Sequence, residues 1–121
     1  MKYIRTKDGI INYDRAIHSI KFWCSEHCYN YYFTRKELKR FDESIKNCKQ
    51  ADTIEELCDE FVVVIEGHNN MNRVFGLEKA KEYWLLMKYK GYKATLYGCI
   101  WTDKGLIYVA KMNEKGELEL L

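Results

Sequence analysis

The residue types best suited to chemistry in this sequence lie in the segment WCSEHC, residues 23–28. Cys24 and Cys28 would share one face of a helix beside a histidine, and Cys48 and Cys58 could complete a tetrahedral thiolate site. The second pair is widely spaced, however, and free cysteine is among the residue types most often buried. We therefore expect buried, reduced thiols and no metal site, with zinc binding and a Cys–His nucleophile as the alternatives.

A second segment combines aromatic and basic side chains. The run YNYYF is followed directly by TRKELKR, so tyrosines precede a set of cations. Tyrosine is a rigid contact residue that suits binding to a macromolecule. The same combination serves single-strand binders, in which bases stack on rings and cations follow phosphates, and it is also typical of a strand followed by a helix with a solvated face. We predict a partner-binding surface formed by Tyr29, Tyr31, Tyr32, Arg35, Lys36, Lys39 and Arg40.

A third segment is acidic, with carboxylates at Asp52, Glu55, Glu56, Asp59 and Glu60. Acidic residues are favoured in the first turn of a helix because they complement its dipole. The alternative is a surface that mimics phosphate charge and occupies the nucleic-acid groove of a host protein.

Signatures of catalysis are missing from the sequence. Its seven glycines follow neither the dinucleotide-binding nor the P-loop spacing, and neither H-E-x-x-H nor G-x-S-x-G occurs. We therefore expect a protein that is not an enzyme, with no catalytic residues and no cofactor.

Composition narrows the class of protein further. The 121 residues suit one domain spanning residues 1–121, and a net charge of +2 argues against a general nucleic-acid coat. The longest apolar run, FVVVI, is far shorter than a membrane span, and five cysteines without a leader-like start argue against secretion. We expect a cytoplasmic protein that does not contact a membrane.

The elements that must position these residues include two hairpins. The phrase YIRTKDGIINY (residues 3–13) nearly repeats as CIWTDKGLIYV (residues 99–109). In both, a glycine closes a short turn between two strand-like runs. We interpret the repeat as one turn chemistry used twice, with a remnant duplication as the alternative. A further turn at NEKG precedes a terminal strand, ELELL.

The remaining pattern predicts three helices and a buried strand. A capping box at TRKE predicts a helix over about 35–45, and a second at TIEE predicts a short helix near 53–60. A long apolar stripe predicts a helix over 77–90 that Gly91 ends, and FVVVI indicates a central strand. The apolar residues of segment 14–33 fit neither the helical nor the strand period, although YNYYF favours a strand. The segment HNNMNR is typical of a loop.

These elements together indicate an α+β fold. We expect an antiparallel or mixed sheet of about five or six strands, with the 77–90 helix packed on one face, and with short helices near 35–45 and 53–60.

Two phrases, ADTIEELCDEFVVV (residues 51–64) and YGCIWTDKGLIYVAKMNEKGELELL (residues 97–121), resemble phrases of small phage and prophage proteins of Gram-positive bacteria. Those proteins also tend to begin like MKYIRTKDG. The resemblance implies a mobile-element origin and no specific reaction. The complete lack of proline and the excess of lysine over arginine agree with an AT-rich genome.

The sequence therefore predicts a non-catalytic phage or prophage protein that binds a host or phage protein in the cytosol. An inhibitor of a host defence system belongs to this class. The alternative function is direct binding of single-stranded nucleic acid through the tyrosine-rich and basic segment.

Overall fold

The two copies of the repeated phrase form hairpins with the same turn chemistry. The computed structural model describes residues 2–68, 71–74 and 76–121. The first hairpin joins β1 (Tyr3–Thr6) to β2 (Gly9–Asn12), and the second joins β6 (Ala94–Thr102) to β7 (Gly105–Met112). In each turn the threonine hydroxyl donates to a glycine carbonyl: Thr6 to Gly9 over 3.1 Å, and Thr102 to Gly105 over 2.9 Å. The predicted reuse of one turn chemistry is confirmed.

The strands form two antiparallel sheets. The smaller has the order β2-β1-β3, in which β3 is Lys49–Ala51. The larger has the order β5-β4-β6-β7-β8, with β4 at Glu60–Ile65, β5 at Met71–Val74 and β8 at Leu118–Leu120. The α+β class is confirmed, and the pairing is antiparallel throughout.

The middle of the larger sheet is the most buried part of the molecule. Phe61, Val62, Val63 and Ile65 of β4 are all buried, as the β-branched run predicted. The loop predicted for HNNMNR is partly wrong, because its last part belongs to β5; residues 69 and 70 lie outside the described residues.

Helix α3 (Leu77–Tyr89) packs on one face of this sheet, and confirms the predicted helix. Trp84 donates its indole N–H to the carbonyl oxygen of Ala94 over 2.9 Å. Gly91 follows the helix with φ +89°, the left-handed conformation that glycine adopts at little cost. The apolar cluster under α3 consists of Phe61, Val63, Ala80, Trp84, Leu96 and Met112.

Most of segment 14–33, which fitted neither the helical nor the strand period, forms the first helix of a helical hairpin. α1 (Tyr13–Glu26) follows β2 directly, and Asn12 caps it by accepting the amide of Arg15 over 3.0 Å. α2 (Tyr31–Ile45) is capped in the same way by Asn30, which accepts from the amide of Phe33 over 2.9 Å. The strand predicted for residues 29–33 is therefore wrong, because the asparagine cap starts a helix there.

The capping boxes predicted at TRKE and TIEE do not start the helices that were expected of them. The 35–45 helix is confirmed, but it begins earlier, and the Thr34 hydroxyl donates to the Asn30 carbonyl instead of capping. Thr53 does accept from the amide of Glu56, over 3.4 Å, yet only the short 3-10 helix η1 (Glu55–Leu57) follows before the chain enters β4. The predicted 53–60 helix is thus reduced to a single turn.

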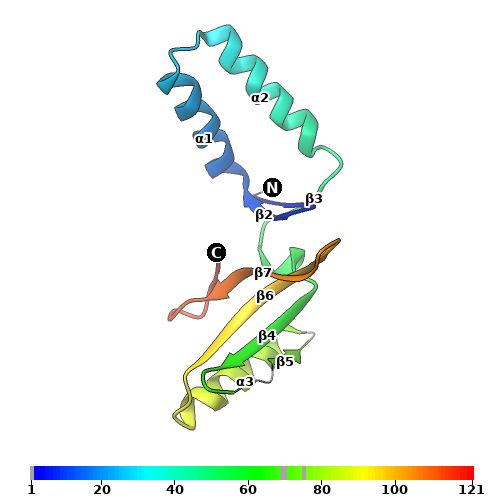
Figure 1. Cartoon of the computed structure of the whole chain (residues 1–121), viewed down its shortest axis with the longest axis vertical. Coiled ribbons are helices and arrows are strands. Elements are labelled where there is room, and N and C mark those ends of the chain that lie inside the picture. Colours follow the sequence, from blue (N-terminus) through cyan, green and yellow to red (C-terminus); the bar gives the residue numbers. More distant parts are fainter. Residues whose placement is uncertain (1, 69–70, 75) are drawn as a thin grey trace.

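The molecule is elongated and has three tiers (Figure 1). The α1–α2 hairpin projects at one end, the three-stranded sheet lies at its base, and the five-stranded sheet with α3 forms the other end. A second apolar cluster joins the two sheets and the segment around η1, and it comprises Ile10, Ile54, Leu57, Ile100, Val109 and Ala110.

Candidate partner-binding surface

The predicted surface lies on the projecting hairpin, which we call the arm (residues 13–45). Within α1 and α2 only Cys24 and Ile45 are buried, because the two helices pack on each other with no third layer. At the base of the arm, the Tyr13 hydroxyl of α1 donates a hydrogen bond to Asp42 of α2 over 2.8 Å. The Asp42 carboxylate thereby raises the pKa of Tyr13. Most of the arm's surface faces solvent and is open to a partner.

Four of the seven predicted residues are brought together on one side of α2. They line a shallow hollow of about 480 Å³, which we call the α2 hollow. Positions separated by three, four and seven residues share one side of a helix, which accounts for the grouping. The lining residues are Tyr32, Arg35, Lys36, Leu38, Lys39 and Asp42.

The other three predicted residues lie outside the hollow. Tyr31 is 68% exposed at the end of the arm, and the Arg35 guanidinium stands over its ring at 5.6 Å. Arg40 pairs with Glu37 on its own helix over 3.3 Å. Tyr29 lies in the turn between the helices. Four residues of the predicted set therefore line the hollow, and Tyr31 adjoins them through Arg35 and Tyr32. Tyr29 and Arg40 do not line the hollow.

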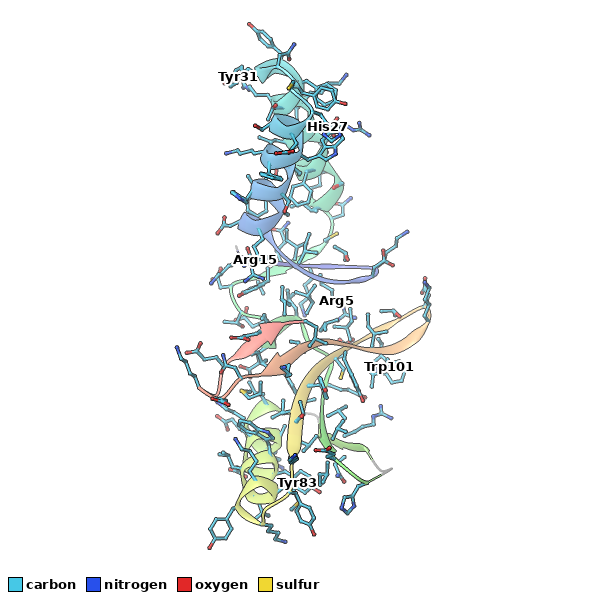
Figure 2. The ribbon with its side chains drawn as sticks, turned by 60° about the vertical axis from the view of Figure 1, so that its left-hand side comes forward. Arg5, Arg15, His27, Tyr31, Tyr83 and Trp101 are labelled. Carbon is cyan, nitrogen blue, oxygen red and sulfur yellow. The ribbon has the colours of Figure 1, made fainter. Side chains whose placement is uncertain are left out.

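An aromatic cluster at the end of the arm includes residues that sequence reasoning missed. The Trp23 ring lies 4.6 Å from His27 and 5.3 Å from Tyr29, measured between ring centroids. Tyr29 in turn lies 4.2 Å from Phe33 and stacks on His27. We call these four residues the tip cluster; Figure 2 shows His27 there, with Tyr31 beyond it. The i, i+4 spacing of Trp23 and His27 is the signal that a helical interpretation of residues 14–33 would have revealed.

The expectation of buried thiols is only partly confirmed. Cys24 and Cys99 are buried as expected, but Cys28 is exposed in the turn of the arm with φ +56°. Burial raises the pKa of Cys58 to about 12 and that of Cys99 to about 11. Across residues 2–68, 71–74 and 76–121, no three His, Cys, Asp or Glu side chains are grouped in a way that could hold a metal ion.

The acidic segment lies between the two sheets, away from the free end of the arm (Figure 1). Asp59 accepts two hydrogen bonds from the Arg5 guanidinium, over 2.6 and 2.7 Å, and one from the Trp101 amide over 2.8 Å. These bonds, chiefly those from Arg5, lower the pKa of Asp59. Glu60 is buried and pairs with Arg73, whose Nε lies 2.9 Å from the carboxylate. Two of the five acidic side chains are thus committed to internal ion pairs.

A second exposed apolar patch occupies the opposite end of the molecule. It consists of Leu85, Leu86 and Tyr89 of α3, with Tyr92 just beyond the helix. The sequence pattern favoured the core stripe of this helix and did not reveal its outer face.

No family model, no curated protein and no solved structure matches the chain. Within the described residues, no helix is both long and apolar enough to cross a bilayer.

Proposed function

We propose that the protein is a phage- or prophage-encoded cytosolic protein that acts without catalysis, by binding a host or phage protein through its arm. Inhibition of a host defence system is one form that such binding takes. The observation that carries the proposal is the projecting arm, which presents Tyr31 and Tyr32 at 68% and 81% exposure beside a set of cations.

The state of the titratable groups supports the non-catalytic part of the proposal. Asp59 and Glu60 each form an ion pair with an arginine and so are poor candidates for general acid–base work. Cys58 and Cys99 have raised pKa values, which keeps them protonated and weakly nucleophilic at neutral pH.

The packing of the tyrosine rings supports a protein partner over nucleic acid. Stacking of bases requires open ring faces. The Tyr29 ring packs against His27 and Phe33, and the Arg35 guanidinium lies over one face of the Tyr31 ring, which leaves Tyr32 as the most exposed ring of the three. Rings with a partly occupied face still offer edges and hydroxyl groups, which suit contacts with a protein.

The test is affinity purification from the native bacterial host with mass spectrometry of the bound proteins. A partner retained by the wild type should be lost with Tyr31→Ala/Tyr32→Ala. The matched control is Tyr89→Ala, which removes a tyrosine of 89% exposure at the other end of the molecule and should leave retention unchanged. Equal retention by all three proteins would remove the arm as the binding surface.

A second candidate function, binding of single-stranded nucleic acid, is favoured by one observation. The acidic segment that would repel phosphates lies between the two sheets, so it does not oppose the cations of α2 directly. Titration of a fluorescent oligonucleotide at two salt concentrations tests it. Binding that weakens steeply with salt, with a slope of about −0.7 per phosphate contact on single strands, would support this function.

A further inference from the structure

The cations that line the α2 hollow do not form ion pairs within the protein, whereas several other cations do. Arg5, Arg40 and Arg73 each pair with a carboxylate. Among the described residues, by contrast, Arg35, Lys36 and Lys39 have no carboxylate within ion-pair distance, and all three are exposed.

One carboxylate also lines the hollow. Asp42 accepts a hydrogen bond from the Tyr13 hydroxyl over 2.8 Å and lies at the far end of the set from Tyr32. It offsets one of the three positive charges, so the hollow keeps a net positive charge on an arm that projects into solvent.

The hollow also has an apolar component. Leu38 is half-buried and contributes to its lining, and Tyr32 adds a ring that is 81% exposed. Residues 32 to 39 span about 10 Å along the helix axis, or two turns. This length matches a short helix or strand of another protein, with cations along it and apolar contacts beside them.

We infer that the α2 hollow binds an acidic segment of the partner protein; the inference rests on the proposed function. The carboxylates of that segment face Lys36, Lys39 and Arg35, whose planar guanidinium suits a bidentate contact. An apolar side chain between the carboxylates packs on Leu38 and Tyr32.

Charge and shape favour such a segment over a nucleic-acid strand. Asp42 places a like charge at one end of the hollow, which a continuous run of phosphates must pass but a spaced set of carboxylates can avoid. Leu38 offers an apolar contact that a sugar–phosphate backbone does not use. Because exposed ion pairs contribute little individually, the charges mainly steer association and the apolar contact retains the segment.

The test measures binding of a synthetic helical peptide with three glutamates and one leucine along one face, by fluorescence anisotropy at low and physiological salt. The control peptide has glutamine in place of each glutamate. Wild-type protein should bind the acidic peptide saturably and the control peptide about tenfold more weakly, because exposed charge pairs govern the encounter.

Charge reversal within the hollow provides the decisive comparison. Lys36→Glu/Lys39→Glu should weaken binding of the acidic peptide by about tenfold or more. A peptide with lysines in place of the glutamates should bind to this variant. The matched control, Lys21→Glu/Lys115→Glu, makes the same change of charge at two exposed lysines outside the hollow and should have little effect. Lys36→Gln/Lys39→Gln gives a milder variant if the reversal disturbs folding.

Four outcomes would overturn the inference: no saturable peptide binding, equal effects of the two reversals, tighter binding of an oligothymidine at the same salt, or self-association through the hollow in sedimentation. The host pull-down separates this failure from failure of the proposed function. A partner that is lost with Tyr31→Ala/Tyr32→Ala but retained by the charge-reversed variant leaves the arm as the binding surface and removes only the acidic segment.

Discussion

Arg5 and Trp101 occupy equivalent positions in the two copies of the repeated phrase, and both contact Asp59. The guanidinium of Arg5 donates to both carboxylate oxygens of Asp59, and to the carbonyl oxygen of Trp101 over 3.2 Å. The amide of Trp101 donates to the same carboxylate. One side chain therefore joins the small sheet to the large one, as the position of Arg5 between the sheets in Figure 2 shows.

This contact predicts a pH-dependent contribution to stability. The pKa of Asp59 is lowered in the folded protein, so its contribution is complete above the unfolded value of about 3.9 and is lost as the pH falls through the folded value. Asp59→Asn should lower the free energy of unfolding by about 1 kcal/mol at pH 7, allowing for solvent screening of a carboxylate that is 31% exposed. The difference from wild type should shrink below about pH 4. Urea denaturation at several pH values measures it.

The control for this prediction is Asp103→Asn, which alters a carboxylate in the exposed turn of the neighbouring hairpin. It should change the free energy of unfolding little at any pH. If the loss in Asp59→Asn stayed constant down to pH 3, packing rather than charge would be its cause.

At the scale of the element, α3 shows how a helix is held by one large side chain. Trp84 is 5% exposed, lies in the apolar cluster against the sheet, and donates to the Ala94 carbonyl at the start of β6. The Lys88 ammonium lies 4.2 Å from the centre of its ring on the outer side. Packing, a hydrogen bond and a cation–π contact therefore converge on one residue.

We predict that Trp84→Ala lowers the free energy of unfolding by about 3–5 kcal/mol, because it leaves a cavity under the helix. Trp84→Phe keeps most of the apolar contact and loses the hydrogen bond, so it should cost about 1–3 kcal/mol. Tyr89→Ala, on the exposed side of the same helix, is the control and should have little effect. Thermal and urea unfolding report all three, and an unchanged melting temperature for Trp84→Ala would contradict the packing described here.

For the whole molecule, the arm and the body differ in how they are stabilised. β4 is buried along almost its entire length, whereas α1 and α2 each bury a single side chain. Local stability follows the amount of buried apolar contact. The arm should therefore open without unfolding of the sheets.

Hydrogen exchange under native conditions tests this difference. Amides of α1 and α2 should exchange through local openings that depend weakly on denaturant, and more rapidly than the paired amides of β4 and β6. The paired amides of the larger sheet serve as the internal reference. A common opening free energy for arm and sheet amides would show instead that the molecule unfolds as one cooperative unit.

Local patterns in the sequence were sufficient to predict the turns, the central strand and α3. The threonine–glycine turns depend on contacts within four residues, and β4 and α3 show their burial in β-branched content or helical period. The grouping of Arg35, Lys36 and Lys39 was also accessible, because residues with these spacings share one side of the predicted 35–45 helix. Tyr32 was assigned to a strand and joins this group only because α2 begins at Tyr31.

Only the tertiary structure decided the remainder. The arm has no third layer, so its helices lack a full apolar stripe, and exposed residues such as Phe22 and Trp23 hide the helical period of α1. Contacts such as Arg5 with Asp59 join residues more than fifty positions apart. Whether a cation has an ion-pair partner, and whether a ring face is covered, likewise depends on what the fold places beside it. Spacing along the chain sets which residues share a face, but burial, pairing and exposure arise only when distant segments pack together.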